Sequence, residues 1–345
     1  MTEALQSVLT KKQQGEYYSL ETLMDRGHWE AFIAFAFVAY VGPVIIAMGT
    51  IFNIATVTVV SSGRIGHVST RILLIVLSLS DLLVLYVGCL DQVLSQAYDI
   101  RLRRISDAMC KVSIFLMEFT LMVSSWSVLL LTLERCICVT FPLKAQFICS
   151  KRRTYFVVVG VFILLFALNS HCLIFMKVGI YPGEGVWCDA GRADAPYFTF
   201  YYTAWGIIRV VMYAAIPFIV ITICNVFIMF KLLRNMRRRM KMQNTQAQKD
   251  LTGITFMLVV VSVVFVILAL PNQVFYAIEP IFFPDLSESE QQAALGFLLG
   301  QSSRTMTYSN HAINFILYCI SGSQFRAVFF DQMKQLRLKL FYHGN

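Results

Sequence analysis

The chain has 345 residues, of which 57% are hydrophobic and 14% are charged, and its formal net charge at pH 7 is +9. A soluble globular domain carries about a quarter charged residues, so this composition excludes that class and indicates an integral membrane protein. We assign the positive charge to a membrane surface rich in anionic lipid and expect no nucleic-acid partner.

Seven apolar segments are each long enough to cross a bilayer as a helix, which takes about 20 residues. In chain order they cover about 32–60, 72–96, 108–139, 154–176, 198–231, 252–281 and 294–320. Lipid offers the backbone no hydrogen-bond partners, so helices are the expected spanning structure. The sequence predicts an all-α fold, a seven-transmembrane helix bundle. Its three parts are an N-terminal segment at 1–31, the helical domain at 32–320 and a tail at 321–345.

The basic residues predict how the bundle is oriented. Most of the 29 lysines and arginines lie after the first, third and fifth segments and in the tail. Basic loops stay on the cytoplasmic side. We therefore expect a multi-pass plasma-membrane protein with an extracellular N-terminus, although Arg101, Arg103 and Arg104 go against the bias.

Polar side chains interrupt the first, second, third and seventh segments: Asn53, Asp81, Ser124, Asn310 and Asn314. A carboxylate inside a membrane is a functional-site hypothesis by default, and residues four apart on a helix share a face. Two interpretations of this set stay open. Asp81, Ser124, Asn310 and Asn314 form a sodium site, or they form a static hydrogen-bond cluster between helices.

The third segment ends in SVLLLTLERCICVTFPL at 127–143, where Glu134 and Arg135 are adjacent. An unpaired charge in hydrocarbon costs about 2.5–3.5 kcal/mol. The pair therefore needs a partner, a watery cavity or a position at the membrane edge.

Two further patterns predict structure outside the third segment. Cys110 and Cys188 both fall on the expected outer side, where disulfides persist, and we expect them to form a disulfide between the top of the third helix and the loop before the fifth. Cys149 falls on the inner side and should stay reduced. Pro217 and Pro271 lie deep in the fifth and sixth segments, where each removes a backbone hydrogen bond. We expect a bend there, either fixed or used in a switch.

The tail at 322–341 predicts an amphipathic helix on the inner membrane face. Its apolar residues share one helical face: Phe325, Phe329, Met333, Leu336 and Leu340. The basic residues of the tail lie elsewhere around the helix.

Taken together, these motifs resemble a rhodopsin-like (class A) G-protein-coupled receptor over nearly the full chain. The matching stretches, besides the two cysteines and Pro217, are GTIFN at 49–53, LSLSD at 77–81, LER at 133–135, PL at 142–143, FVILALP at 265–271, NFILY at 314–318 and FR at 325–326. Within the family, the chain looks most similar to invertebrate neuropeptide receptors of the FMRFamide-like or thyrotropin-releasing-hormone-like kind.

The resemblance implies roles for four residues in a G-protein switch. Glu134 would hold Arg135 at rest, and Arg135 would turn toward the G protein when the sixth helix moves. Asn314 and Tyr318 would belong to the same switch. The alternative is an interfacial ion pair that only anchors the helix end and contributes little.

Several positions depart from the family's pattern. Ala269 replaces the usual tryptophan of the sixth helix, Phe315 the proline beside Asn314, and Asn225 the usual tyrosine of the fifth helix. His311 stands where a small polar residue is common beside the cation site. These departures leave open whether activation uses the family's usual local rearrangements.

By the resemblance, six residues face a ligand cavity in the outer half: Asp91, Glu118, Arg209, Gln273, Arg304 and Tyr308. Buried charges must be paired, so Glu118–Arg209 and Asp91–Arg304 either satisfy each other or contact ligand. Amine receptors carry an acid in the middle of the third helix, where this chain has Met117, and opsins carry a lysine in the seventh helix, where this chain has none. The sequence therefore excludes both classes.

We therefore expect a receptor that binds an extracellular ligand, a short neuropeptide, and activates a heterotrimeric G protein. A chemosensory receptor of the same fold for a small charged molecule is the alternative, and a membrane transporter is a remote one because paired repeats are missing. Neither a catalytic constellation nor a cofactor motif is evident, apart from the sodium hypothesis.

Overall fold

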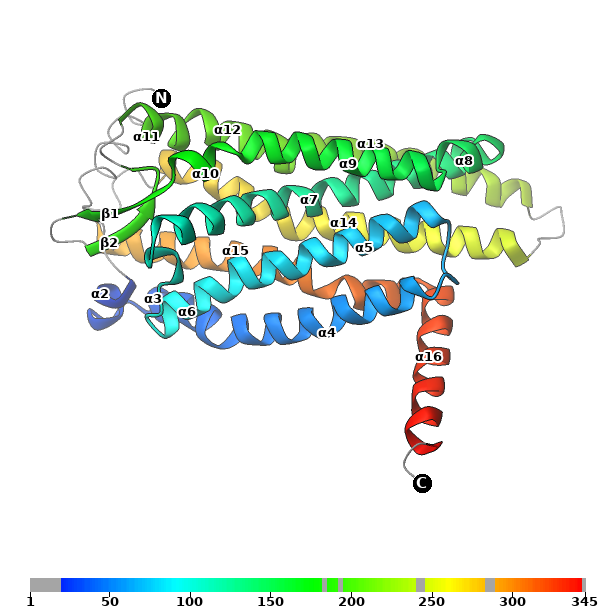
Figure 1. Ribbon diagram of the computed structural model, residues 1–345, viewed down its shortest axis with the longest axis horizontal. Helices are drawn as coiled ribbons and strands as arrows, with labels where there is room; N and C mark the ends of the chain where they lie inside the picture. The colour runs from blue at the N-terminus through cyan, green and yellow to red at the C-terminus, as the bar shows by residue number, and fades with distance from the viewer. Residues whose placement is uncertain (1–19, 182–184, 192–194, 240–245, 283–288, 343–345) are drawn as a thin grey trace.

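The computed structural model describes residues 20–181, 185–191, 195–239, 246–282 and 289–342. Long helices lie side by side in one bundle, as Figure 1 shows. Six of these spans are long and apolar enough to cross a membrane by themselves, and the seventh qualifies when it is taken with the helix that follows it. The predicted all-α, seven-helix bundle is confirmed.

The first four spans are built from the following helices and turns. Span one is α3 (Trp29–Ala36), η1 (Phe37–Val41) and α4 (Gly42–Ser61), after the short α2 (Leu20–Asp25). Span two is α5 (Val68–Val84), η2 (Leu85–Leu90) and α6 (Asp91–Ala97). Span three is α7 (Asp107–Thr140), with η3 (Leu102–Arg104) before it and α8 (Pro142–Ile148) after it. Span four is α9 (Lys151–Asn169) and α10 (His171–Phe175).

The remaining spans follow a two-stranded hairpin, β1 (Lys177–Tyr181) and β2 (Gly185–Asp189). Span five is α11 (Ala195–Tyr202), α12 (Ala204–Val210), η4 (Val211–Ala215) and α13 (Ile216–Arg239). Spans six and seven are α14 (Gln246–Phe282) and α15 (Glu290–Ser321), and α16 (Ser323–Tyr342) follows. We call the end of the bundle that carries β1 and β2 the hairpin end, and the opposite end the α16 end.

The bundle is apolar on its outer surface as well as inside. Ile51, Ile163 and Ile223 are each about 60% exposed and lie on three different spans. Inside, Leu74, Met122 and other large side chains are fully buried in one continuous core. Apolar residues on both faces suit a helix bundle surrounded by lipid.

The hairpin is tied to the beginning of α7. Val178 pairs with Cys188 in the antiparallel ladder, and Cys188 forms a disulfide with Cys110. The Val178 amide also donates to a carboxylate oxygen of Asp107 over 2.7 Å. The predicted disulfide is present and fixes the hairpin over the top of the third span.

Three spans contain a widened π-helical turn, at η1, η2 and η4. Such turns rotate the side chains that follow them and often lie at functional sites. η2 immediately precedes Asp91, and η4 contains Tyr213. Both residues line the cavity described below.

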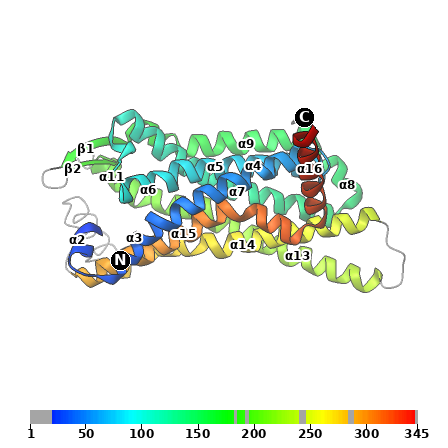
Figure 2. The same ribbon diagram turned by 90° about the horizontal axis from the view of Figure 1, so that it is seen from below.

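The helix α16 bends by 94° from α15, so it runs roughly at right angles to the long helices and projects outward from the end of the bundle. Phe325 is 1% exposed, whereas Phe330 is 65% exposed. The predicted terminal helix is present, and Phe325 of its predicted apolar face packs against Tyr318 of α15, whereas the side chains of Leu336 and Leu340 lie outside the described residues. Figure 2 shows that α13 and α14 extend together past α16.

Candidate functional site

A cavity of about 350 Å³ opens between the spans in the hairpin half of the bundle. Spans two, three, five, six and seven all contribute to it, together with η3. Its polar lining includes all six residues that the sequence assigned to a ligand pocket. These are Asp91, Glu118, Arg209, Gln273, Arg304 and Tyr308, joined by Arg103 and Tyr276.

Both acids of the cavity are paired with arginines. Arg209 donates to a Glu118 oxygen over 3.2 Å, as one of the predicted pairings requires. Of the two pairings that the sequence left open, Asp91 with Arg304 is not found among the described contacts, since Asp91 instead lies 2.8 Å from the guanidinium of Arg103. The short turn η3 brings Arg103 back over the second span, where it also donates to the Val87 carbonyl over 2.9 Å.

The three loop arginines that contradicted the basic-loop rule have separate environments. Arg103 enters the cavity, Arg104 lies 3.9 Å from the ring centre of Trp187, and Arg101 pairs with Asp99. Burial lowers the pKa of Arg104, and the neighbouring Arg101 lowers it further. These contacts could not be predicted from the sequence, because they depend on the path of the loop between spans two and three.

Tyr276 connects the arginines of spans five and seven. The guanidinium of Arg209 lies 4.8 Å from the centre of its ring, and Arg304 donates to its hydroxyl over 3.2 Å. The sequence did not single out Tyr276, although a tyrosine among cationic residues is a common stacking partner. With Arg103, the described residues that line the cavity include three arginines and two carboxylates.

The Glu134–Arg135 pair lies near the α16 end of α7 and is buried. Arg135 is 0% exposed, and its Nη2 lies 3.0 Å from a Glu134 oxygen. Thr70 of α5 stands between the two, since it accepts a hydrogen bond from Arg135 and its hydroxyl lies 2.9 and 3.0 Å from the two Glu134 oxygens. Ser69 donates to the same carboxylate. The partners that the charge pair needs in its apolar segment are thus supplied by the second span.

Only one of the three guanidinium nitrogens, Nη2, has hydrogen-bond partners among the described residues. Among the residues that the structure describes, Nε and Nη1 of Arg135 have no hydrogen-bond partner. A buried donor without a partner costs about 1–3 kcal/mol, and more when it is charged. Burial of Arg135 therefore carries a free-energy cost, which its contacts with Glu134 and Thr70 oppose.

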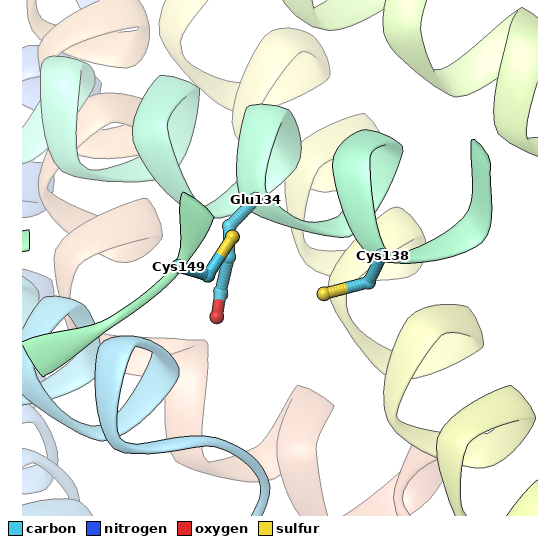
Figure 3. Close-up of side chains that lie close together, drawn as sticks. All are labelled: Glu134, Cys138 and Cys149. Atoms are coloured by element: carbon cyan, nitrogen blue, oxygen red, sulfur yellow. The ribbon is translucent and has the colours of Figure 1, made fainter. Parts of the chain in front are cut away.

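Two cysteines lie beside this pair. Figure 3 shows Cys138 on the same side of α7 as Glu134, and Cys149, which follows α8, next to the Glu134 side chain. The two cysteine sulfur atoms and a carboxylate oxygen of Glu134 all lie within 4.8 Å of one another, close enough to share a metal ion. However, a carboxylate has about four acceptor positions, and the hydroxyls of Ser69 and Thr70 and the guanidinium of Arg135 already take up three of those of Glu134. Burial also raises the pKa of the Cys149 thiol to about 12.

Between the two ends, the predicted sodium site is assembled only in part. Asp81 accepts hydrogen bonds from Ser124 and Asn314, each over 2.7 Å. Asn310 is buried on the same helix, but among the described contacts none joins it to Asp81. His311 instead lies beside Asp81, where the sequence predicted Asn310, with its Nδ1 2.7 Å from an Asp81 oxygen.

The other switch residues pack toward α16. Tyr318 is 0% exposed and lies 5.3 Å from the ring of Phe325. Phe315, which replaces the usual proline, stacks on Phe52 with ring centres 5.5 Å apart. Asn225 donates to the Ser262 hydroxyl over 2.7 Å and so joins the fifth and sixth spans directly.

Comparison with known proteins agrees with this arrangement. The thyrotropin-releasing hormone receptor of Gallus gallus is 24% identical over 312 residues, which cover 83% of this chain and 75% of that protein. The growth hormone secretagogue receptor type 1 of Oryctolagus cuniculus is 26% identical over 82% of this chain and 76% of its own length. Formyl peptide receptor 2 of Mus musculus is 26% identical over 65% of this chain and 63% of its own length.

The predicted resemblance to class A receptors, and to the thyrotropin-releasing-hormone receptors among them, is thereby confirmed. A family model described as the 7 transmembrane receptor (rhodopsin family) matches residues 52–318. This match covers more than half of the chain, including the cavity, the Asp81 cluster and the Glu134–Arg135 pair. The chain belongs to the rhodopsin family of seven-transmembrane receptors.

Proposed function

We propose that this receptor binds a short peptide at the hairpin end and activates a heterotrimeric G protein at the α16 end. The observation that carries the proposal is the placement of two charged sites at opposite ends of one helix. α7 contributes Glu118 to the cavity and Glu134–Arg135 to the buried pair. A movement of α7 or of its neighbours therefore acts on both sites.

The proposed orientation places the hairpin end outside the cell and the α16 end in the cytoplasm of a plasma-membrane receptor. The disulfide between Cys110 and Cys188 supports this orientation, because disulfides persist on the extracellular side. The basic loops after spans one, three and five support it as well.

Arg135 is the proposed switch residue, and Asn314 and Tyr318 of α15 are proposed to belong to the same switch. At rest, Glu134 and Thr70 hold one nitrogen of the guanidinium, while its other two nitrogens lack partners among the described residues. A G-protein carbonyl or carboxylate at the cytoplasmic opening would satisfy those donors. Binding of a partner at that end then favours the state in which Arg135 is released.

The cavity suggests a ligand with hydrogen-bond acceptors as well as donors. It has an excess of arginine over carboxylate, and within the described residues Nε of Arg209 and Oε1 of Gln273 have no partner. A short peptide offers backbone carbonyls, amides and a terminal carboxylate in one molecule. The named relatives include receptors for thyrotropin-releasing hormone and for formyl peptides, which supports a peptide ligand.

A small charged molecule remains the second candidate, because about 350 Å³ lies near the lower end of the usual ligand-pocket range of about 300–1,000 Å³. A chemosensory receptor would use the same arginines to bind a carboxylate. A library that contains both short peptides and small organic acids separates the two candidates directly.

The test is a screen of that library on cells that express the receptor with a promiscuous G protein. We expect a short peptide to give a saturable response. Arg135→Ala should abolish that response while surface expression and binding of the labelled peptide stay largely intact. An undiminished response in Arg135→Ala cells would contradict the proposed switch.

The same peptide tests the cavity. Arg304→Gln removes a charge from the lining and should lower potency at least tenfold, equal to about 1.4 kcal/mol of lost interaction. Arg101→Gln is the matched control, because Arg101 pairs with Asp99 at the same end and does not line the cavity. Equal potency shifts in both variants would place the ligand elsewhere.

A further inference from the structure

Among the residues whose burial the structure describes, the most completely buried carboxylate is Asp81, which is 0% exposed on α5. Three other side chains donate hydrogen bonds to it, from two neighbouring helices. Ser124 of α7 and His311 of α15 lie 2.7 Å from Oδ1, and Asn314 of α15 donates to Oδ2 over 2.7 Å. Both oxygens of the carboxylate are thus engaged.

The His311 ring acts as a donor toward Asp81. A carboxylate oxygen only accepts hydrogen bonds, so the close Nδ1 atom must carry the hydrogen. His311 is itself 0% exposed, and its Nδ1 also lies 3.4 Å from the Ser124 hydroxyl. The imidazole therefore occupies the space between the second, third and seventh spans beside the carboxylate.

The backbone that carries this ring is fixed by the first span. The side-chain amide of Asn53 donates to the His311 carbonyl and to the Gly49 carbonyl, each over 2.9 Å. The helices α4 and α15 approach each other closely here. A Cβ added at Gly49 would lie only 3.1 Å from the Cβ of Ala312. The ring cannot leave Asp81 by a shift of its own helix without breaking these contacts.

A sodium ion has different requirements. Hard cations bind carboxylate, carbonyl, hydroxyl and water oxygens, whereas two of the three groups around Asp81 present nitrogen-bound hydrogens. These hydrogens take up the same lone pairs that a cation would use. The residues present at this site therefore do not fit a bound sodium ion.

We propose that His311 replaces the alkali cation in the core of this receptor, so that Asp81 is satisfied by the chain's own imidazole and Na⁺ does not bind there. The receptor core is then indifferent to sodium concentration. A serine at position 311 removes the ring, frees one side of the carboxylate and supplies a hydroxyl oxygen, which opens the site to Na⁺.

The test measures thermal unfolding of the purified full-length receptor in nanodiscs, followed by tryptophan fluorescence. Chloride salts of sodium, potassium and N-methyl-D-glucamine are compared at the same ionic strength of about 0.15 M. The wild-type protein should unfold at the same temperature in all three salts. His311→Ser should unfold at least about 2 °C higher in sodium than in potassium, because a ligand that binds only the folded state stabilises it.

Two variants make the result specific to this site. His311→Gln keeps an N–H donor near the carboxylate and should stay indifferent to sodium. Asp81→Asn, added to His311→Ser, should remove the sodium effect. A sodium-specific stabilisation of the wild-type protein would overturn the proposal, and so would a folded His311→Ser protein that does not respond. If the serine variant does not fold, the wild-type comparison alone still decides between the two outcomes.

Discussion

At the scale of single residues, the charged pair in the third span shows what a sequence can and cannot predict. The cost of an isolated charge in lipid predicts that Glu134 and Arg135 need partners, and the structure supplies them. The partners themselves, Ser69 and Thr70, are ordinary polar residues at the beginning of α5. They could not be recognised before the second and third spans were aligned in space.

The same limit applies to the acids of the cavity. Glu118 and Arg209 lie in apolar segments, where few charges compete, so their pairing could be predicted. Asp91 pairs with Arg103 from a loop, and a loop's return path depends on contacts far apart in sequence. The sequence identifies His311 as a departure from the family's pattern, but its distance from Asp81 can be known only from the fold.

Cys149 gives a residue-scale prediction about pH. Burial raises the pKa of its thiol from 9.0 to about 12, and only the thiolate reacts with iodoacetamide. At pH 7.5 the folded protein should therefore alkylate Cys149 about a thousandfold more slowly than an ordinary thiol. The rate should keep rising tenfold per pH unit through about pH 10.

The measurement is the alkylation rate of the Cys149 peptide by mass spectrometry from about pH 7 to about pH 10. The same receptor unfolded in dodecyl sulfate is the control, and its rate should level off near pH 9. A plateau near pH 9 in the folded receptor would show that the fold does not raise the pKa of this thiol.

At the scale of elements, the spans were predictable because hydrophobicity along a helix is a local property. The tail helix was also predictable, since its apolar residues repeat with helical spacing. The π-helical turns η2 and η4 were not, because each side chain there is compatible with an ordinary helix. Asp91, directly after η2, and Tyr213, within η4, nevertheless both line the cavity.

The packing of α16 against the bundle gives an element-scale prediction. Phe325 is 1% exposed, and its ring lies 5.3 Å from Tyr318 and 5.6 Å from Phe315. Phe325→Ala should lower the free energy of unfolding by about 3 kcal/mol, through lost burial and the remaining cavity. Phe330→Ala on the same helix is the control, because that ring is 65% exposed.

The comparison uses chemical unfolding of both variants in the same detergent. We expect Phe330→Ala to stay within about 0.5 kcal/mol of the wild-type protein. A similar loss in both variants would mean that α16 contributes general apolar surface rather than a specific contact.

At the scale of the whole molecule, the receptor is a bundle with a charged cavity at one end and a buried charge pair at the other. Contacts between Asp81, His311 and Asn314 lie between them on spans two and seven. Phe315, Tyr318 and Phe325 continue that contact chain to α16. Ligand binding at the cavity can therefore bias the position of Arg135 only if these spans have two stable arrangements.

The central claim is that Glu134 restrains Arg135 in the resting receptor. Glu134→Gln keeps the shape of the side chain but removes the charge that holds the guanidinium. Hydrogen bonds to charged groups are worth about 1.5–3 kcal/mol, so the variant should populate the released state at least about tenfold more. Asp331→Asn is the control, because it neutralises an exposed carboxylate paired with Arg64 near the same end.

The most direct measurement is ligand-free nucleotide exchange on purified heterotrimeric G proteins, catalysed by each receptor in nanodiscs. We predict a several-fold higher basal rate for Glu134→Gln than for the wild-type receptor, no change for Asp331→Asn, and no stimulation by Glu134→Gln once Arg135→Ala is added. A folded Glu134→Gln receptor with a basal rate at or below that of the wild type would contradict the account.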